Sequence, residues 1–351
     1  MAAVAWPSSS FDLQTDLPLR ARAYLLGSDD VVLGLTVHHI SLDGRSMRPF
    51  LRDLLVAYAA RSGGHAPGWS PLPVDYVDYT LWKHASLGRF DDEFSRATGQ
   101  LQYWANTLTG RPSPLVFPCD RPRPPVPDRT GATVAVSVDR HTHGQLLQCA
   151  QNAGASIFMV LQAAFALSVA EFARCADVTV ATAVAGRDHP WLDDLVGNFS
   201  ADVLMRIRLD RSRDAAELLH QVRRVSLAAF ARADTPNHRL KRALPECPGH
   251  PVFQTTLVLQ RDAVTYPARE SGLSVTEVPI DVVHAKHDLE FGLTEHYDHF
   301  GIPAGISGSF VYPTALFDRR TSARFVTGFI ATVQSLAAES WRVADQLRSL
   351  R

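Results

Sequence analysis

The chain has 351 residues, of which 46% are hydrophobic and 20% charged, a composition typical of a globular protein. Its 35 Lys and Arg residues against 36 Asp and Glu residues give a formal net charge of −1. This balance provides no electrostatic reason to expect binding to nucleic acid or to an anionic membrane surface. No apolar run is long enough to span a membrane, and the first residues lack the basic region of a signal peptide, so we expect a cytoplasmic protein.

The cysteines provide no case for a metal site or a disulfide framework. They are four in number, widely separated, and contain no C-x-x-C pair. We therefore interpret them as buried or incidental thiols in a reducing compartment. The four are Cys119, Cys149, Cys175 and Cys247.

The N-terminal part of the chain predicts a β-hairpin followed by a helix. Residues 19–26 alternate in polarity, residues 27–30 have turn-forming composition, and residues 31–37 are almost continuously apolar. The second strand is therefore expected to be central in its sheet and buried on both faces, with Gly34 marking a bulge or a close approach. From Met47 to Tyr58 the apolar residues recur at helical spacing, with Ser46 as the expected N-cap.

Farther along, strand and helix patterns alternate on either side of a proline-rich segment. Seven of the 22 prolines fall between Arg111 and Asp128, which favours an extended linker. We expect a partial N-terminal lobe over residues 1–110, the linker over 111–127 and a C-terminal lobe over 128–351. Further helices are expected at 94–108, 157–172, 215–231 and 323–338, and strands at 132–138, 178–184, 252–259, 273–278, 289–294 and 305–312. The alternation predicts an α/β fold.

The segment from His38 to Gly44 carries the strongest chemical signal in the chain. Two adjacent histidines end a predicted strand, and Asp43-Gly44 follow just before a predicted helix. Side chains alternate across a strand, so His38 and His39 should point in opposite directions and cannot readily chelate one metal together. We expect one imidazole to face a cavity and the other to face the packed interior, and we expect no metal. Asp43 is placed to accept backbone hydrogen bonds or to pair with a buried cation.

This segment resembles the H-H-x-x-x-D-G signature of condensation domains of nonribosomal peptide synthetases. These domains belong to the chloramphenicol-acetyltransferase-like superfamily of acyltransferases. Further stretches match the family's motifs in the same order, so that the resemblance covers almost the whole chain. The matching stretches are Phe11–Leu13 with Pro18–Arg22, Tyr76–Trp82, Ala183–Arg187, Val196–Phe199 and His287–Leu289.

The chain departs from the family pattern in two places. After Val196–Phe199 the family usually continues V-N-T, whereas this chain has Ser200-Ala201-Asp202. The histidine signature begins at residue 38, whereas family members carry roughly another hundred residues before it, as a complete lobe requires. The resemblance therefore implies a two-lobed α/β fold with an incomplete N-terminal lobe. Such a chain is truncated, completed by another polypeptide, or a remnant.

The resemblance implies amide-bond formation between two substrates, each carried on a phosphopantetheine arm. The arms belong to partner peptidyl or acyl carrier proteins, for example those of adjoining synthetase modules. They enter a tunnel between the lobes. No bound cofactor is expected, because the donor thioester is already activated. The protein then supplies positioning, proton handling and oxyanion stabilisation, and we expect the N-terminus of the helix at Met47 to aid the last of these.

The resemblance also assigns roles within the site. His39 is expected to handle the proton or orient the amine, with His38, Asp43 and Gly44 completing the catalytic motif. Asp43 is expected to be structural and paired with Arg206, and Gly44 to permit a backbone angle or an approach that a Cβ would block. Tyr76, Asp78 and Trp82 are expected to pack and hydrogen-bond around the site rather than to react.

Three other functions remain open. One is an ester-forming or free-acceptor acyltransferase of the same superfamily. The plant-type branch is disfavoured because its D-F-G-W-G motif is absent. Another is an epimerisation domain, although residues 43–47, DGRSM, are closer to the condensation pattern DGWSM. The third is a non-catalytic platform that docks carrier proteins.

Overall fold

The computed structural model describes residues 11–338 except 28–29, 113, 211–213, 237–238, 241–249, 252, 262–272, 274, 277 and 279–282. The chain forms two compact units that interleave in sequence. The first unit comprises Met1–Ala85, Ala185–Ser200 and Val264–Thr276, and the second comprises Ser86–Val184, Ala201–Ala263 and Glu277–Arg351. The lobe boundaries near residues 110 and 128 stay a prediction, as does the incomplete N-terminal lobe.

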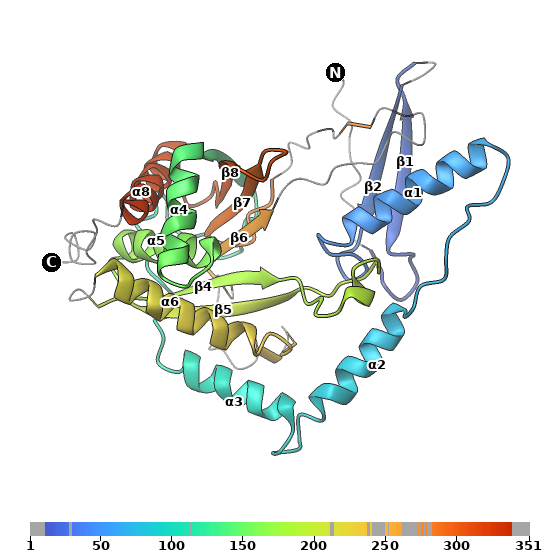
Figure 1. Cartoon of the computed structure of the whole chain (residues 1–351). Helices are drawn as coiled ribbons and strands as arrows, with labels where there is room; N and C mark the ends of the chain where they lie inside the picture. The colour runs from blue at the N-terminus through green and yellow to red at the C-terminus, as the bar shows by residue number, and fades with distance from the viewer. Residues whose placement is uncertain are drawn as a thin grey trace. The chain divides into compact units, whose positions relative to one another are not determined.

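The first unit contains the predicted hairpin and two helices (Figure 1). Strands β1 (Leu19–Leu25) and β2 (Val31–Val37) pair antiparallel in regular register, with Gly34 opposite Arg22 and no bulge. Helix α1 (Met47–Ser62) ends just before Gly63 and Gly64. Helix α2 (Tyr76–Leu87) was not predicted as an element.

The expectation that β2 is a central, doubly buried strand is wrong for the described residues, where β1 and β2 form a two-stranded sheet. The run arises because the strand carries apolar side chains on both faces, with Val31 and Leu33 on one face and Val32 on the other. Val31 and Leu33 are 55% and 49% exposed, so at least one face of this strand is not buried. An apolar run by itself does not report how many strands flank it.

The second unit is built on a six-stranded mixed sheet in the order β3-β8-β7-β6-β4-β5. The β6–β7 and β4–β6 pairs are parallel and the other pairs antiparallel. Its strands are β3 (Gly131–Val138), β4 (Asp177–Val184), β5 (Ala201–Arg208), β6 (Thr255–Arg261), β7 (Leu289–Tyr297) and β8 (Pro303–Pro313). Its α-helices are α3 (Arg96–Leu108), α4 (Arg140–Asn152), α5 (Ile157–Ala173), α6 (Ala215–Phe230) and α8 (Arg319–Ala337).

Helix α5 is the centre of the second unit's core. Its residues from Met159 to Ala170 are all buried, and it contacts α4, α6, α8 and β4. Phe165 on α5 meets Phe291 of β7 and Phe329 of α8 edge to face. The continuous apolar composition of α5 follows from burial on all sides.

Most predicted elements of this unit are confirmed, with ends shifted by a few residues. Helix α4 and strand β5 were not predicted, and α4 is a polar helix with only a narrow buried face. The strand predicted at 273–278 is not found: of these positions 274 and 277 lie outside the described residues, and the other four are not in a strand. Segment 111–127 contains no helix or strand among its described residues, as its prolines indicate.

Among the described residues, no single helix is long and apolar enough to cross a membrane. Helices α4 and α5 together pass the same test of length and composition, with a bend of 101° between them.

Candidate functional site

The histidine signature lies in the motif loop, residues 38–46, which joins β2 to α1. The His38 amide donates to the Pro18 carbonyl at 2.9 Å, and the Ser41 amide donates to the His38 carbonyl at 3.0 Å. The loop therefore turns immediately after the hairpin.

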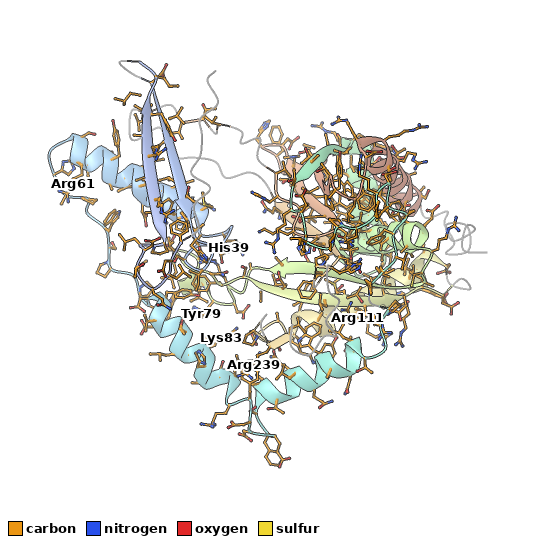
Figure 2. All side chains as sticks on the ribbon, turned by 180° about the vertical axis from the view of Figure 1, so that it is seen from behind. His39, Arg61, Tyr79, Lys83, Arg111 and Arg239 are labelled. Atoms are coloured by element: carbon orange, nitrogen blue, oxygen red, sulfur yellow. The ribbon has the colours of Figure 1, made fainter. Side chains whose placement is uncertain are left out.

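The two histidine rings have different surroundings. His38 is partly buried: its Nδ1 accepts a hydrogen bond from the Ile40 amide at 3.0 Å, and its ring meets Phe11 edge to face at 5.9 Å. His39 is exposed at the base of the hairpin, where Figure 2 labels it, and no described residue makes a hydrogen bond to its ring. The ring of His38 fixes the turn, whereas the ring of His39 remains accessible.

Asp43 is the anchor of the motif loop. Its side chain is 3% exposed. Oδ1 accepts from the Ser46 amide and lies near the Ser46 hydroxyl, both at 2.8 Å, and Oδ2 accepts from the Phe199 amide at 3.0 Å. The Asp43 amide in turn donates to the Gly197 carbonyl at 3.1 Å. The carboxylate therefore ties the loop to residues 197–199, which are more than 150 positions away in sequence.

The cation beside Asp43 is Arg187. Its Nη2 lies 3.3 Å from Asp43 Oδ1 and donates to Ser46 Oγ at 2.7 Å, and its side chain is 1% exposed. Nη1 donates to the carbonyls of Leu192 and Leu195, and the guanidinium lies 4.0 Å from the centre of the Phe199 ring. All these groups belong to the first unit.

The predicted pairing of Asp43 with Arg206 is therefore wrong. Arg206 lies on β5 in the second unit and forms a two-pronged ion pair with Asp177, at 2.8 and 2.6 Å. Its remaining N–H groups donate to the carbonyls of Thr107, Thr109 and Gly110 at the end of α3. All five N–H groups of the guanidinium are thus used. Arg206 caps a helix and does not support the motif loop.

Hydrogen bonds and charge keep Asp43 ionised. Burial alone raises the pKa of a carboxyl group, but the bonds from Ser46 and from the Phe199 amide, with the charge of Arg187, hold the pKa of Asp43 below its ordinary value. The carboxylate also lies at the N-terminus of α1, whose partial positive charge favours an anion. That helix end, expected to aid an oxyanion, thus already holds the carboxylate of Asp43.

Ser46 was predicted as the N-cap of α1, and it occupies that position without a capping bond from its side chain. Its hydroxyl lies 2.7 Å from the Gly197 carbonyl and accepts from the Gly197 amide at 3.1 Å. The hydroxyl links the motif loop to the segment Val196–Phe199. Ser46 is fully buried.

Tight backbone packing explains two glycines near this cluster. A Cβ on Gly197 would overlap the Tyr76 ring, and a Cβ on Gly186, where φ is +62°, would overlap the Phe199 carbonyl. The Tyr76 hydroxyl donates to the Asn198 carbonyl at 2.7 Å, and burial raises the pKa of Tyr76, which keeps this donor protonated. Gly186 and Gly197 thus allow the segments around Arg187 and Phe199 to pack closely against the motif loop.

Gly44 does not have the role expected from its sequence. A Cβ at this position would meet no atom within 4 Å, and Gly44 is not among the glycines with positive φ. The expectation of a special backbone angle or a close protein contact is wrong. Gly44 is exposed and leaves open space beside the motif loop.

Asp78 and Trp82 lie on α2 away from the hydrogen bonds of Asp43. Asp78 accepts from the Asp75 amide at 2.9 Å while Asp75 accepts from the Asp78 amide at 2.8 Å, which is a capping box. Trp82 is 54% exposed, lies 6.2 Å from the Tyr79 ring, and has the Lys83 ammonium 5.8 Å from its ring centre.

Sequence reasoning missed Arg187 and the side-chain role of Ser46. Both lay in stretches already matched to family motifs, but linear spacing could not select Arg187 over Arg206 as the partner of Asp43. The signal that could have found Arg187 is Gly186 directly before it, because a left-handed glycine turns the chain after β4.

The part of the chain that the structure describes contains no group of three or more His, Cys, Asp or Glu side chains that could hold a metal ion. Expectations about a cofactor stay predictions.

The mixed sheet and the motif loop define a protein of the chloramphenicol-acetyltransferase-like fold, which solved condensation domains share. The condensation-domain family profile matches residues 3–350, and the chain belongs to this family.

Two relatives show the context in which such domains occur. An isonitrile lipopeptide synthase of Mycobacterium tuberculosis is 38% identical over 99% of this chain, and a dimodular nonribosomal peptide synthase of Bacillus subtilis is 37% identical over 94%. The chain spans 14% of the length of each.

Among solved structures, the X-domain from teicoplanin biosynthesis is similar with a TM-score of 0.86 and 30% identity. The match covers 96% of this chain and 76% of the X-domain chain. The X-domain has also been solved in a complex with OxyB.

Proposed function

We propose that this chain is a condensation-type acyltransferase that forms an amide bond between a donor acyl thioester and an acceptor amine. Both substrates are presented on phosphopantetheine arms of carrier proteins. Membership of the condensation-domain family supports the class of reaction, and the relatives' synthetase context supports carrier-bound substrates. No bound cofactor is required, because the thioester is activated before it arrives.

The observation that carries the proposal is the contrast between His39 and Asp43. An exposed imidazole projects from a loop whose buried carboxylate is fixed by three hydrogen bonds and an ion pair. A positioned but accessible imidazole suits proton transfer or amine orientation, because the substrate must reach it without the loop moving.

The proposed step is aminolysis of a thioester. The acceptor nitrogen attacks the donor carbonyl carbon, a C–N bond forms, and the C–S bond breaks. The amine loses one proton and the departing sulfur gains one, so the reaction needs no oxidant or reductant. His39 would accept the proton from nitrogen or hold the amine in its attacking orientation. Gly44 leaves room beside this position for a substrate.

The test measures turnover with purified protein and two loaded carrier proteins. If His39 acts as a general base, His39→Ala should lower turnover by ~10²–10⁴-fold. His65→Ala is the matched control, because His65 is an exposed histidine just beyond α1 and outside the motif loop. A loss below tenfold in a folded His39→Ala protein would leave only a positioning role, and no loss would refute the assignment.

A non-catalytic docking platform is the second candidate, and one comparison favours it. The teicoplanin X-domain, 30% identical to this chain, was solved in complex with OxyB. As a platform, the chain would bind loaded carriers or a partner enzyme without releasing product, and His39→Ala would bind equally well. An ester product in the same assay would instead identify the ester-forming alternative.

A further inference from the structure

A small pocket with several charged side chains in its lining lies wholly within the second unit and has no part in the motif loop. Its volume is about 120 Å³. It is lined by segments 123–129 and 285–288, the end of β8 and residues 250–251. Since one water molecule takes about 30 Å³ in the liquid, the pocket has room for a small ion or functional group.

The walls of this pocket are held firmly. The Ala285 amide donates to the Arg129 carbonyl at 2.9 Å, and the Thr314 amide donates to the Thr130 carbonyl at 3.0 Å. Proline rings fix the backbone at four lining positions. These positions are Pro124, Pro127, Pro251 and Pro313. The pocket is therefore organised before any ligand arrives.

Both carboxylates of the pocket are already used. Asp288, 3% exposed, accepts from Arg123 at 2.6 Å and from Gln254 at 2.9 Å. Asp128 accepts from the Thr130 amide at 2.8 Å, and this bond holds the pKa of Asp128 below its ordinary value. Asp288 is thus neutralised by Arg123, whereas the amide bond leaves the negative charge of Asp128 in place.

Two further cations of the lining, Arg129 and Lys286, outnumber the one carboxylate that is not paired with a cation. Arg129 and Lys286 line the pocket, are exposed, and form no ion pair with any described residue. His250 Nδ1 is buried and lacks a hydrogen-bond partner within the described ranges. A buried polar nitrogen without a partner loses several kcal/mol of hydration unless a ligand or water satisfies it.

We propose that this pocket binds a phosphate group. Arg129 and Lys286 would neutralise its charge, His250 Nδ1 would donate a hydrogen bond, and Arg123 would remain paired with Asp288 as part of the wall. Arginine and lysine are the side chains that most often bind phosphate in proteins. The proposal does not depend on the condensation reaction and involves none of the motif-loop residues.

The test is a titration of the full chain with inorganic phosphate at constant ionic strength, with chloride as the reference anion. Phosphate should raise the melting temperature more than chloride, because a ligand that binds only the folded state stabilises it. The double variant Arg129→Gln/Lys286→Gln should weaken phosphate binding about tenfold or more. Arg140→Gln, an exposed arginine on α4 outside the pocket, should leave binding unchanged.

Two results would overturn the site. One is equal stabilisation of the chain by phosphate and by chloride. The other is equal phosphate affinity of the wild-type chain and the double variant, provided that circular dichroism shows the double variant to be folded. Glycerol 3-phosphate distinguishes the sources of the group. Tighter binding than inorganic phosphate, lost in the double variant, points to a phosphate carried by an organic molecule, whereas equal binding points to the free anion.

Discussion

Two buried arginines, one in each unit, are bound in different ways. Arg206 donates all its N–H groups, to Asp177 and to three carbonyls that end α3. Arg187 joins Asp43, Ser46 and two carbonyls, lies over Phe199, and leaves its Nε without a hydrogen-bond partner among the described residues. The first arginine completes a helix end, and the second clamps the motif loop. A buried arginine that matches a family position in the sequence therefore need not contact the histidine signature.

The largest expected effect comes from removing the carboxylate of Asp43. Asp43→Ala leaves the buried charge of Arg187 unpaired and should lower the free energy of unfolding by ~3–5 kcal/mol. Urea denaturation followed by tryptophan fluorescence measures the loss. Asp53→Ala, at an exposed carboxylate on α1, is the matched control and should lose far less. Equal stability of Asp43→Ala and the wild-type protein would contradict the clamp.

A double-mutant cycle tests which arginine belongs to Asp43. The Asp43→Asn and Arg187→Gln variants should show a coupling energy of about 0.5–3 kcal/mol, because the two side chains are in contact. Asp43→Asn and Arg206→Gln should be additive within about 0.5 kcal/mol. Coupling of the second pair, with none in the first, would restore the pairing expected from sequence.

Acid should remove the contribution of Asp43. Its pKa is lowered in the folded protein, so the unfolded chain binds the proton more readily. The stabilisation is therefore fully present above the ordinary carboxyl pKa of about 4 and is lost as the pH falls through the lower folded value. The stability difference between the wild-type protein and Asp43→Asn, measured from neutral pH down to pH 3, should shrink only below about pH 4. A difference that stays constant over this range would contradict an ionised Asp43.

Gly44→Ala should have the smallest effect on stability. Because an added Cβ meets no atom within 4 Å, the change in unfolding free energy should stay within about 0.5 kcal/mol. If turnover nevertheless falls, the glycine keeps space for a substrate. A large loss of stability would instead restore the backbone role expected from sequence.

Local patterns predicted most of the fold. Alternating polarity predicted β1, apolar residues at helical spacing predicted α1, and a long apolar run predicted α5. Each of these signals is contained within one element. Helix α4 was missed because most of its surface is polar, and α2 because its sequence was interpreted only as a motif.

The site was predicted only in part. The motif placed His38, His39 and Asp43 in one loop, and the structure places them there. The partners of Asp43 could not be predicted, since Arg187 and Phe199 reach it through a turn after β4 that depends on tertiary packing. Nor could the sequence show that Gly44 faces open space. A glycine that leaves room beside a loop and a glycine that allows an unusual backbone angle cannot be distinguished by sequence alone.

The sheet of the second unit has a narrow seam. Within the described part of the chain, strands β4 and β6 share a single register pair, Ala181 with Thr256, whereas β6 and β7 pair over seven positions. The Thr255 hydroxyl adds one bond across the seam, to the Thr179 carbonyl at 2.7 Å. Amide hydrogen exchange follows the opening of such local units. The β4–β5 hairpin should therefore separate from the other four strands before either part loses its own strand pairing. Under mechanical load, the sheet should open first between β4 and β6.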